Sequence, residues 1–155
     1  MKLHLGCGKI YIDGFKHVDL QDFDHIDYRN SVDNLNFAKD NSVTLIYAAH
    51  VLEHFGRNEY KIVLREWFRA LKPNGILRTI CPDIMVWINK IYNGTDDKFF
   101  KTYKDSLDVP HWENYIYPIK NKIKTNTQVL NSMIFNWGHK WMWDFNSLKM
   151  ELESI

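Results

Sequence analysis

The sequence has few of the features that would place it in a specialised class of protein. Its 155 residues include only two cysteines, Cys7 and Cys81, which are too few for a disulfide framework and favour a reducing, cytoplasmic setting. No stretch approaches the roughly 18 apolar residues that a membrane span requires, so none is expected. The formal net charge is only +1, and therefore no broad basic surface points to a nucleic-acid partner.

The composition that is present is that of a globular domain rich in aromatic side chains. Hydrophobic residues make up 45% of the chain and aromatic residues 15%, which excludes disordered and low-complexity classes. A chain of this length can bury a core without disulfides or metals. We expect a single domain over residues 1–155, with an α/β core at 1–83 and a helical, aromatic-rich C-terminal cap at 84–155.

Hydrophobic patterning predicts strands and helices that alternate along the first half of the chain. Short apolar runs predict strands at residues 3–5, 16–20, 43–49 and 76–81. The most regular helical stripe predicts a helix at 58–72, ended by the Pro-Asn-Gly turn at 73–75. Further helices are expected at residues 84–92, 98–103, 127–136 and 147–154, the last capped by Asn146. This alternation predicts an α/β fold with a mostly parallel sheet.

The turn Gly6-Cys7-Gly8 follows the first predicted strand, and Asp19 ends the second. Glycines allow a sharp turn and let a ligand approach backbone N–H groups closely. An acid at the end of the next strand can accept hydrogen bonds from ribose hydroxyls. The third glycine of the NAD fingerprint is missing, and Asp19 comes only eleven residues after Gly8. An NAD enzyme is therefore disfavoured.

The segment H-V-L-E-H at residues 50–54 fits the motif of inverted zinc proteases. That chemistry needs a third ligand downstream, and no downstream acid is marked out, so no metal is expected. For Glu53 and His54 the alternative is a structural role, in which they tie the loop to neighbouring backbone. His50 stands just past the predicted central strand, where open α/β sheets bind ligands, and is a candidate catalytic base.

Histidine and tryptophan side chains also gather in the predicted cap. His139 is a candidate base or substrate contact, and His111 and Trp141 are candidate substrate contacts. Aromatic faces stack well on sugar rings, although burial in the core is the alternative for each tryptophan.

Several segments, in the same order along the chain, resemble class I S-adenosylmethionine-dependent methyltransferases. They are K-L-H-L-G-C-G at 2–8, G-F at 14–15, V-D-L at 18–20, D-N-S-V-T-L-I-Y at 40–47, H-V-L-E-H at 50–54 and L-K-P-N-G-I-L at 71–77. The segments at 138–140, 144–145 and 147–148 resemble a bacterial subgroup often linked to surface-polysaccharide genes. The resemblance implies a Rossmann-like sheet that stops before the family's last two strands.

The resemblance also implies roles for individual residues. The residues expected to bind S-adenosylmethionine are Gly6, Cys7, Gly8, Asp19, Leu20, Ser31, Val32 and His50. Asp19 would hold the ribose, and Ser31 and Val32 the adenine, with Asp33 or Asp27 as alternatives for the adenine contact. The expected catalytic residues are His50 and His139. The expected substrate contacts are His54, His111 and Trp141.

These features predict methyl transfer from S-adenosylmethionine, by in-line displacement, to a small-molecule or saccharide acceptor. The alternative is a catalytically inactive module that binds a cofactor or a partner with the same fold. A truncated sheet would leave the strand at 76–81 as an apolar edge, which invites pairing with another chain. We expect this edge to be covered by residues 112–124 or by a second copy in a homodimer. Cys7 and Cys81 should lie two strands apart, too far for a disulfide.

Overall fold

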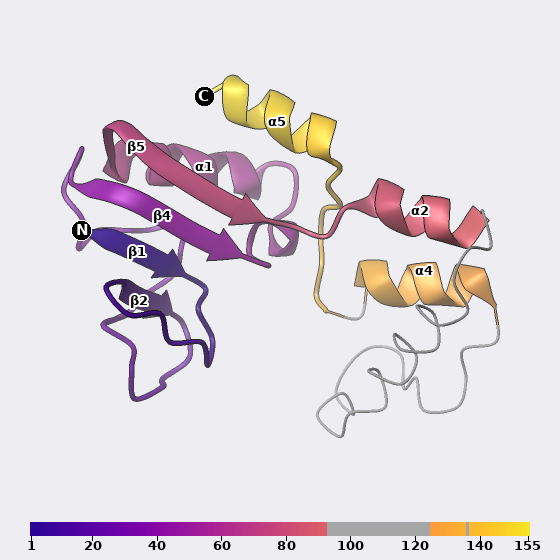
Figure 1. Cartoon of the computed structure of the whole chain (residues 1–155), viewed down its shortest axis with the longest axis horizontal. Helices are drawn as coiled ribbons and strands as arrows, with labels where there is room; N and C mark the ends of the chain where they lie inside the picture. Colours follow the sequence, from indigo (N-terminus) through magenta and orange to yellow (C-terminus); the bar gives the residue numbers. More distant parts are fainter. Residues whose placement is uncertain (93–124, 136) are drawn as a thin grey trace.

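The computed structural model describes residues 1–92, 125–135 and 137–155, which form a parallel sheet with helices around it (Figure 1). The strands are β1 (Lys2–Leu5), β2 (Lys16–Asp19), β3 (Tyr28–Arg29), β4 (Val43–Ala49) and β5 (Leu71–Ile80). They are ordered β3-β2-β1-β4-β5, and every neighbouring pair is parallel. The expected α/β fold with a Rossmann-like sheet is confirmed.

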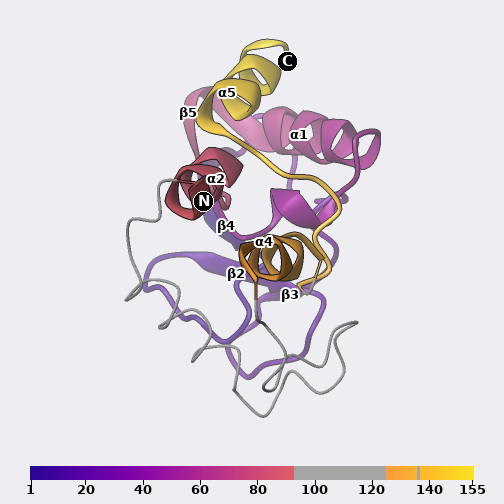
Figure 2. The same ribbon diagram turned by 90° about the vertical axis from the view of Figure 1, so that its right-hand side faces the viewer.

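Helices are α1 (Glu59–Ala70), α2 (Ile84–Tyr92), α4 (Asn126–Phe135) and α5 (Phe145–Glu153), with a short 3₁₀ turn, η1, at Leu52–His54. α2 and α4 pack together beyond the carboxyl end of β5, which confirms a helical C-terminal region (Figures 1 and 2). The helix expected at 98–103 lies outside the described residues. Among the described residues no helix is both long and apolar enough to cross a membrane.

Two predicted boundaries are wrong for local reasons. α1 ends at Ala70, because Leu71 is already extended (ψ 138°) and pairs with Val43 in β4. The pairing resumes at Leu45 with Ile76, so the Pro-Asn-Gly turn at 73–75 bulges out of β5 and does not precede it. The second error concerns the start of α5.

α5 is capped by Asp144, two residues before the expected Asn146. The Asp144 Oδ1 atom accepts a hydrogen bond of 2.6 Å from the Ser147 backbone N–H. The Ser147 hydroxyl in turn accepts one of 3.1 Å from the Asp144 N–H, which completes a reciprocal capping box. Leu148, in the first turn of α5, packs against the hydrophobic core.

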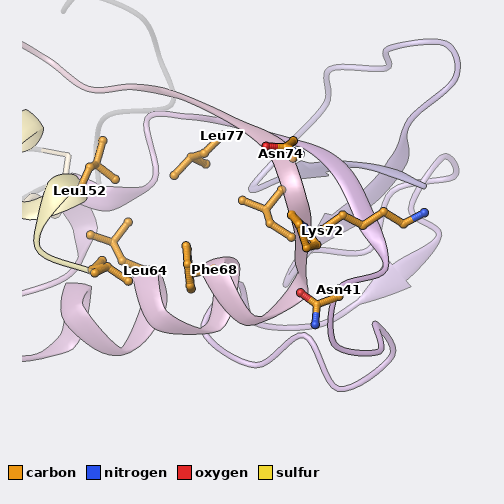
Figure 3. A pocket seen from close by; sticks show the side chains of 11 residues that line it. Asn41, Leu64, Phe68, Lys72, Asn74, Leu77 and Leu152 are labelled. Atoms are coloured by element: carbon orange, nitrogen blue, oxygen red, sulfur yellow. The ribbon is translucent and has the colours of Figure 1, made fainter.

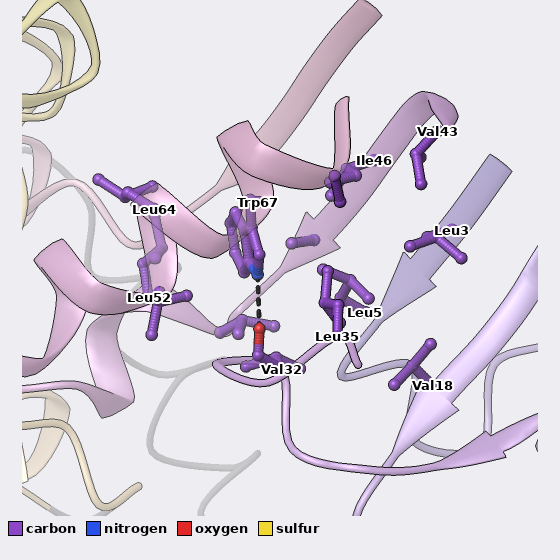
Figure 4. Packing of buried hydrophobic residues seen from close by; sticks show 14 of the residues in the cluster. Leu3, Leu5, Val18, Val32, Leu35, Val43, Ile46, Leu52, Leu64 and Trp67 are labelled. Atoms are coloured by element: carbon purple, nitrogen blue, oxygen red, sulfur yellow. Dashed lines mark hydrogen bonds between the residues drawn. The ribbon is translucent and has the colours of Figure 1, made fainter. Parts of the chain in front are cut away.

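The main core lies between α1 and one face of the sheet (Figure 4). α1 presents its apolar stripe, including the fully buried Val63 and Trp67. The strands contribute buried side chains from the facing surface: Leu3, Leu5, Val18, Ile46 and Ala48. Full burial of a side chain of this size stabilises the fold by about 1.5–3 kcal/mol, so this layer holds the carboxyl edge of the sheet in place.

The opposite face of the sheet carries a row of ring and cationic side chains in register across four strands. His17, His4, Tyr47 and Arg78 are successive pairing partners. The His4 ring lies 5.5 Å from that of His17 and 5.1 Å from that of Tyr47, and the Arg78 guanidinium lies 5.5 Å from the Tyr47 ring centre. Burial, together with the nearby His17 and His25, lowers the pKa of His4 to about 4, so this ring is neutral near pH 7.

Among the described strands β5 stands at one edge of the sheet, as expected. A largely apolar hollow of about 500 Å³ lies between α1, β5 and α5, lined by side chains that include Leu64, Phe68, Leu77 and Leu152 (Figure 3). Residues 112–124, the expected cover, lie outside the described part of the chain, so the cover stays a prediction. Cys7 and Cys81 are both free, and β4 lies between the strands that precede them.

Candidate functional site

The loop after β1 has two glycines in the left-handed region of backbone space. Gly6 has φ 60° and Gly8 has φ 52°. Gly6 donates a hydrogen bond of 2.9 Å to the Val18 carbonyl, which fixes the turn against β2. A Cβ atom at Gly6 would lie only 2.6 Å from the Val51 Cγ2 atom, whereas one at Gly8 would meet nothing within 4 Å. Gly6 is therefore required both by its φ and by the close approach of Val51.

Asp19 ties this loop to the end of β2. Its Oδ2 atom accepts a hydrogen bond of 2.8 Å from the Gly8 N–H, and its Oδ1 atom accepts one of 2.8 Å from the Gln21 N–H. A carboxylate oxygen has two lone pairs, so each oxygen keeps the capacity to accept one more hydrogen bond. The Asp19 carboxylate is thus oriented by the protein and can still accept hydrogen bonds from ligand hydroxyls.

A cleft of about 390 Å³ opens at the carboxyl ends of the strands. Six of the eight residues expected to bind the cofactor line it: Gly6, Asp19, Leu20, Ser31, Val32 and His50. His54, expected to contact substrate, lines it as well. Cys7 and Gly8 are not among the lining residues, and burial, helped by Asp19, raises the pKa of the Cys7 thiol to about 11. Cys7 is therefore a buried neutral thiol behind the cleft.

Val32 is held beside the cleft by α1, which contacts it from the core side. The Trp67 indole donates a hydrogen bond of 2.8 Å to the Val32 carbonyl (Figure 4). The preceding residue of the same helix, Glu66, accepts a hydrogen bond of 2.7 Å from the Leu35 N–H. Sequence reasoning missed this support, because Trp67 and Val32 are 35 positions apart.

The two alternatives for the adenine contact lie elsewhere. The Asp27 carboxylate accepts hydrogen bonds from the Lys16 ammonium at 2.6 Å and from the His17 N–H at 2.8 Å. Neither Asp27 nor Asp33 lines the cleft. Of the four residues considered for the adenine contact, only Ser31 and Val32 line the cleft.

His50 takes a strained conformation at the point where β4 ends. Its φ is 57°, and its N–H donates a hydrogen bond of 2.9 Å to the Ile80 carbonyl of β5. A non-glycine residue in this region costs free energy and is found disproportionately at functional sites. Its Nδ1 atom lies 3.1 Å from the Glu53 Oε1 atom, and this hydrogen bond raises the pKa of His50.

The segment around His139 docks onto η1, although the two are some 85 positions apart. The Glu53 carbonyl accepts hydrogen bonds from the N–H groups of Lys140 at 2.7 Å and Trp141 at 3.2 Å. The docking places the His139 ring 5.3 Å from the His54 ring, edge to face. Burial lowers the pKa of His139, so its imidazole is neutral near pH 7.

Of the remaining predicted substrate contacts, Trp141 does not line the cleft. Trp141 packs beside the core, with its ring 5.8 Å from Tyr60 and 6.3 Å from Trp143. Trp143 is itself 1% exposed. The structure therefore supports the packing alternative for Trp141. His111 lies outside the described residues.

Comparison with known proteins supports one general activity. Residues 15–79, which run from the end of the first loop to the end of β5 and are fewer than half of the chain, match a family model described as a methyltransferase domain. No curated protein matches the chain. A solved structure of a candidate type II methyltransferase from Anaeromyxobacter dehalogenans is similar at 15% identity, with a TM-score of 0.38. The similarity covers 60% of this chain and 48% of the other, so the chain spans about half of that structure. The matched family model supports methyl transfer in general.

Proposed function

We propose that the protein transfers the methyl group of S-adenosylmethionine to a small-molecule or saccharide acceptor. The observation that carries this proposal is the convergence of Gly6, Asp19 and His50 on one cleft at the carboxyl edge of the sheet. Asp19 and His50 also fall inside the stretch that matches a methyltransferase domain. Ligands of open α/β sheets bind at this edge.

The residues of the cleft fit the parts of the cofactor. Gly6 lines the cleft with backbone alone, and its left-handed φ turns the loop so that the methionine and ribose portion can lie against it. Asp19 has accepting capacity for the two ribose hydroxyls. Ser31 and Val32 supply the wall for the adenine, and the Trp67 bond steadies Val32. The cofactor supplies a methyl group already activated on a positively charged sulfur, for in-line displacement.

The chain's own task is then to position the acceptor and to receive its proton. His139 is the better candidate base, because burial keeps its imidazole neutral near pH 7 and able to accept a proton. Its ring does not itself line the cleft but packs against that of His54, which does. His50 is drawn toward its protonated form by Glu53, and therefore suits binding of an acceptor oxygen better than proton abstraction. In this proposal residues 1–83 hold the cofactor, and residues 84–155 complete the acceptor side.

The proposal is tested by calorimetric titration of the whole chain with S-adenosylhomocysteine. We expect binding, and a rise in melting temperature, because a ligand of the native state stabilises it by mass action. Asp19→Asn should weaken binding by about 1–3 kcal/mol, the scale of hydrogen bonds to a charged group. Asp22→Asn is the matched control, since Asp22 is exposed and pairs only loosely with Arg29 at 3.6 Å.

Two results would contradict the proposal. One is binding of NADH in place of the sulfur compound. The other is equal binding of S-adenosylhomocysteine by the Asp19→Asn and Asp22→Asn variants. Release of S-adenosylhomocysteine in the presence of hydroxyl-bearing saccharides then tests the acceptor class.

A further inference from the structure

Glu53 is a fully buried carboxylate that is only half satisfied. Its side chain is 0% exposed. The Oε1 atom is hydrogen-bonded by His50 at 3.1 Å, but within the described part of the chain the Oε2 atom has no hydrogen-bond partner. A buried carboxylate oxygen without a partner is costly, so a structural pairing with His50 explains only one of the two oxygens.

Two imidazoles stand beside this unsatisfied carboxylate. One ligating atom each from Glu53, His54 and His139 lies within 4.8 Å of the others. The His139 Nδ1 atom is also buried and, among the described residues, without a hydrogen-bond partner. The imidazole tautomer protonated at Nε2 carries a lone pair on this Nδ1 atom. This arrangement leaves the Nδ1 lone pair of His139 available.

We propose that Glu53, His54 and His139 form a binding site for one divalent transition-metal ion of the Zn²⁺ class. Two imidazole nitrogens and one carboxylate oxygen are a donor set that suits Zn²⁺ and related ions, whereas Ca²⁺ and Mg²⁺ prefer oxygen ligands throughout. Ligands at about 2.0–2.2 Å from a zinc ion lie within roughly 4 Å of one another. The observed spacing of up to 4.8 Å is somewhat wider, so the three side chains would have to draw together to bond the ion.

The surroundings of the site supply the outer support that metal ligands usually have. His50 holds the Oε1 atom of Glu53 and so orients the carboxylate. The backbone bonds from Lys140 and Trp141 to the Glu53 carbonyl fix the chain on both sides of the site.

Three protein ligands leave at least one coordination position open. Zinc sites with three protein ligands use that position for water or substrate. His54 lines the cleft as well as belonging to the cluster, so the ion would border the cleft. The proposal of a metal site does not depend on methyl transfer, and with the ion bound His139 could not also be the base, because the ion would take up its Nδ1 lone pair. The H-V-L-E-H segment supplies two of the ligands, Glu53 and His54. The third, His139, is distant in sequence and is brought to the site by the docking of residues 138–141.

The test uses the full chain without a histidine tag, stripped with a chelator and titrated with Zn²⁺ by calorimetry. We expect one Zn²⁺ per chain and, with Co²⁺ as a probe, the visible absorption of a nitrogen- and oxygen-ligated ion. His54→Gln and His139→Gln should each weaken Zn²⁺ binding by at least about 10-fold. His25→Gln is the matched control, because His25 lies in a separate ring cluster with His17 and should leave Zn²⁺ binding unchanged.

Glu53→Gln is a third variant that should weaken Zn²⁺ binding, and circular dichroism checks that it folds. If it does not fold, the two histidine variants still decide the test. The inference is overturned if the wild-type chain binds no Zn²⁺, or if His54→Gln and His139→Gln bind it as tightly as His25→Gln does. S-adenosylhomocysteine binding, measured on the same stripped proteins, reports on the proposed function separately. A variant that loses Zn²⁺ binding but keeps its affinity for S-adenosylhomocysteine supports the metal site and leaves the proposed function unaffected.

Discussion

Substitution of Gly6 by alanine should destabilise the protein more than the same substitution at Gly8. Both residues have a left-handed φ, 60° and 52°, so each alanine incurs a backbone cost of about 1–2 kcal/mol. Only the Gly6 variant also drives a Cβ atom to 2.6 Å from the Val51 Cγ2 atom. Overpacking of this kind costs typically about 1–3 kcal/mol. We expect losses of about 2–5 kcal/mol for Gly6→Ala and about 1–2 kcal/mol for Gly8→Ala.

The assay is urea unfolding followed by circular dichroism, with S-adenosylhomocysteine binding measured in parallel. Val51→Ala removes the colliding methyl group, so the double variant Gly6→Ala/Val51→Ala should lose less stability than the two single losses added together. The coupling should be about 1–2 kcal/mol, as for residues in contact. The reasoning is refuted if Gly6→Ala and Gly8→Ala are equally stable, or if the double variant shows no coupling.

Two further predictions follow from buried side chains behind the cleft and on the other face of the sheet. Trp67→Phe removes the indole hydrogen bond to the Val32 carbonyl and should lower the free energy of unfolding by about 1–3 kcal/mol. It should also weaken S-adenosylhomocysteine binding, although Trp67 does not line the cleft. Unchanged affinity would show that the bond does not position Val32. His4 has a pKa of about 4 in the folded state, below its value in the unfolded state, so the unfolded chain binds the proton first as pH falls. The free energy of unfolding should therefore drop by up to about 3 kcal/mol between about pH 6.5 and about pH 4. His4→Phe should remove this part of the pH dependence in urea unfolding measured at both ends of the range, and an equally steep loss in the variant would contradict the assignment.

Local pattern was enough to predict most of the secondary structure and half of the candidate site. The helical stripe that became α1 and the apolar run that became β4 are read directly from residue spacing, because burial on one face imposes that spacing. Gly6 and Asp19 could be located because each follows a strand, and parallel strands end at a shared edge. The start of α5 was misplaced because Asp144 and Asn146 are both good caps, and only the geometry with Ser147 distinguishes them.

Apart from the short strand β3, the sequence by itself determined the succession of strands and helices along the chain, the glycine turn and the acid beside it. These features depend on neighbouring residues and on hydrophobic periodicity. Only the tertiary structure decided which distant groups meet. Trp67 reaches Val32 because α1 folds back over the sheet, and His139 reaches His54 because two backbone N–H groups of its segment bind the Glu53 carbonyl. Contacts of this kind arise from packing between elements far apart in the chain, and no local periodicity records them.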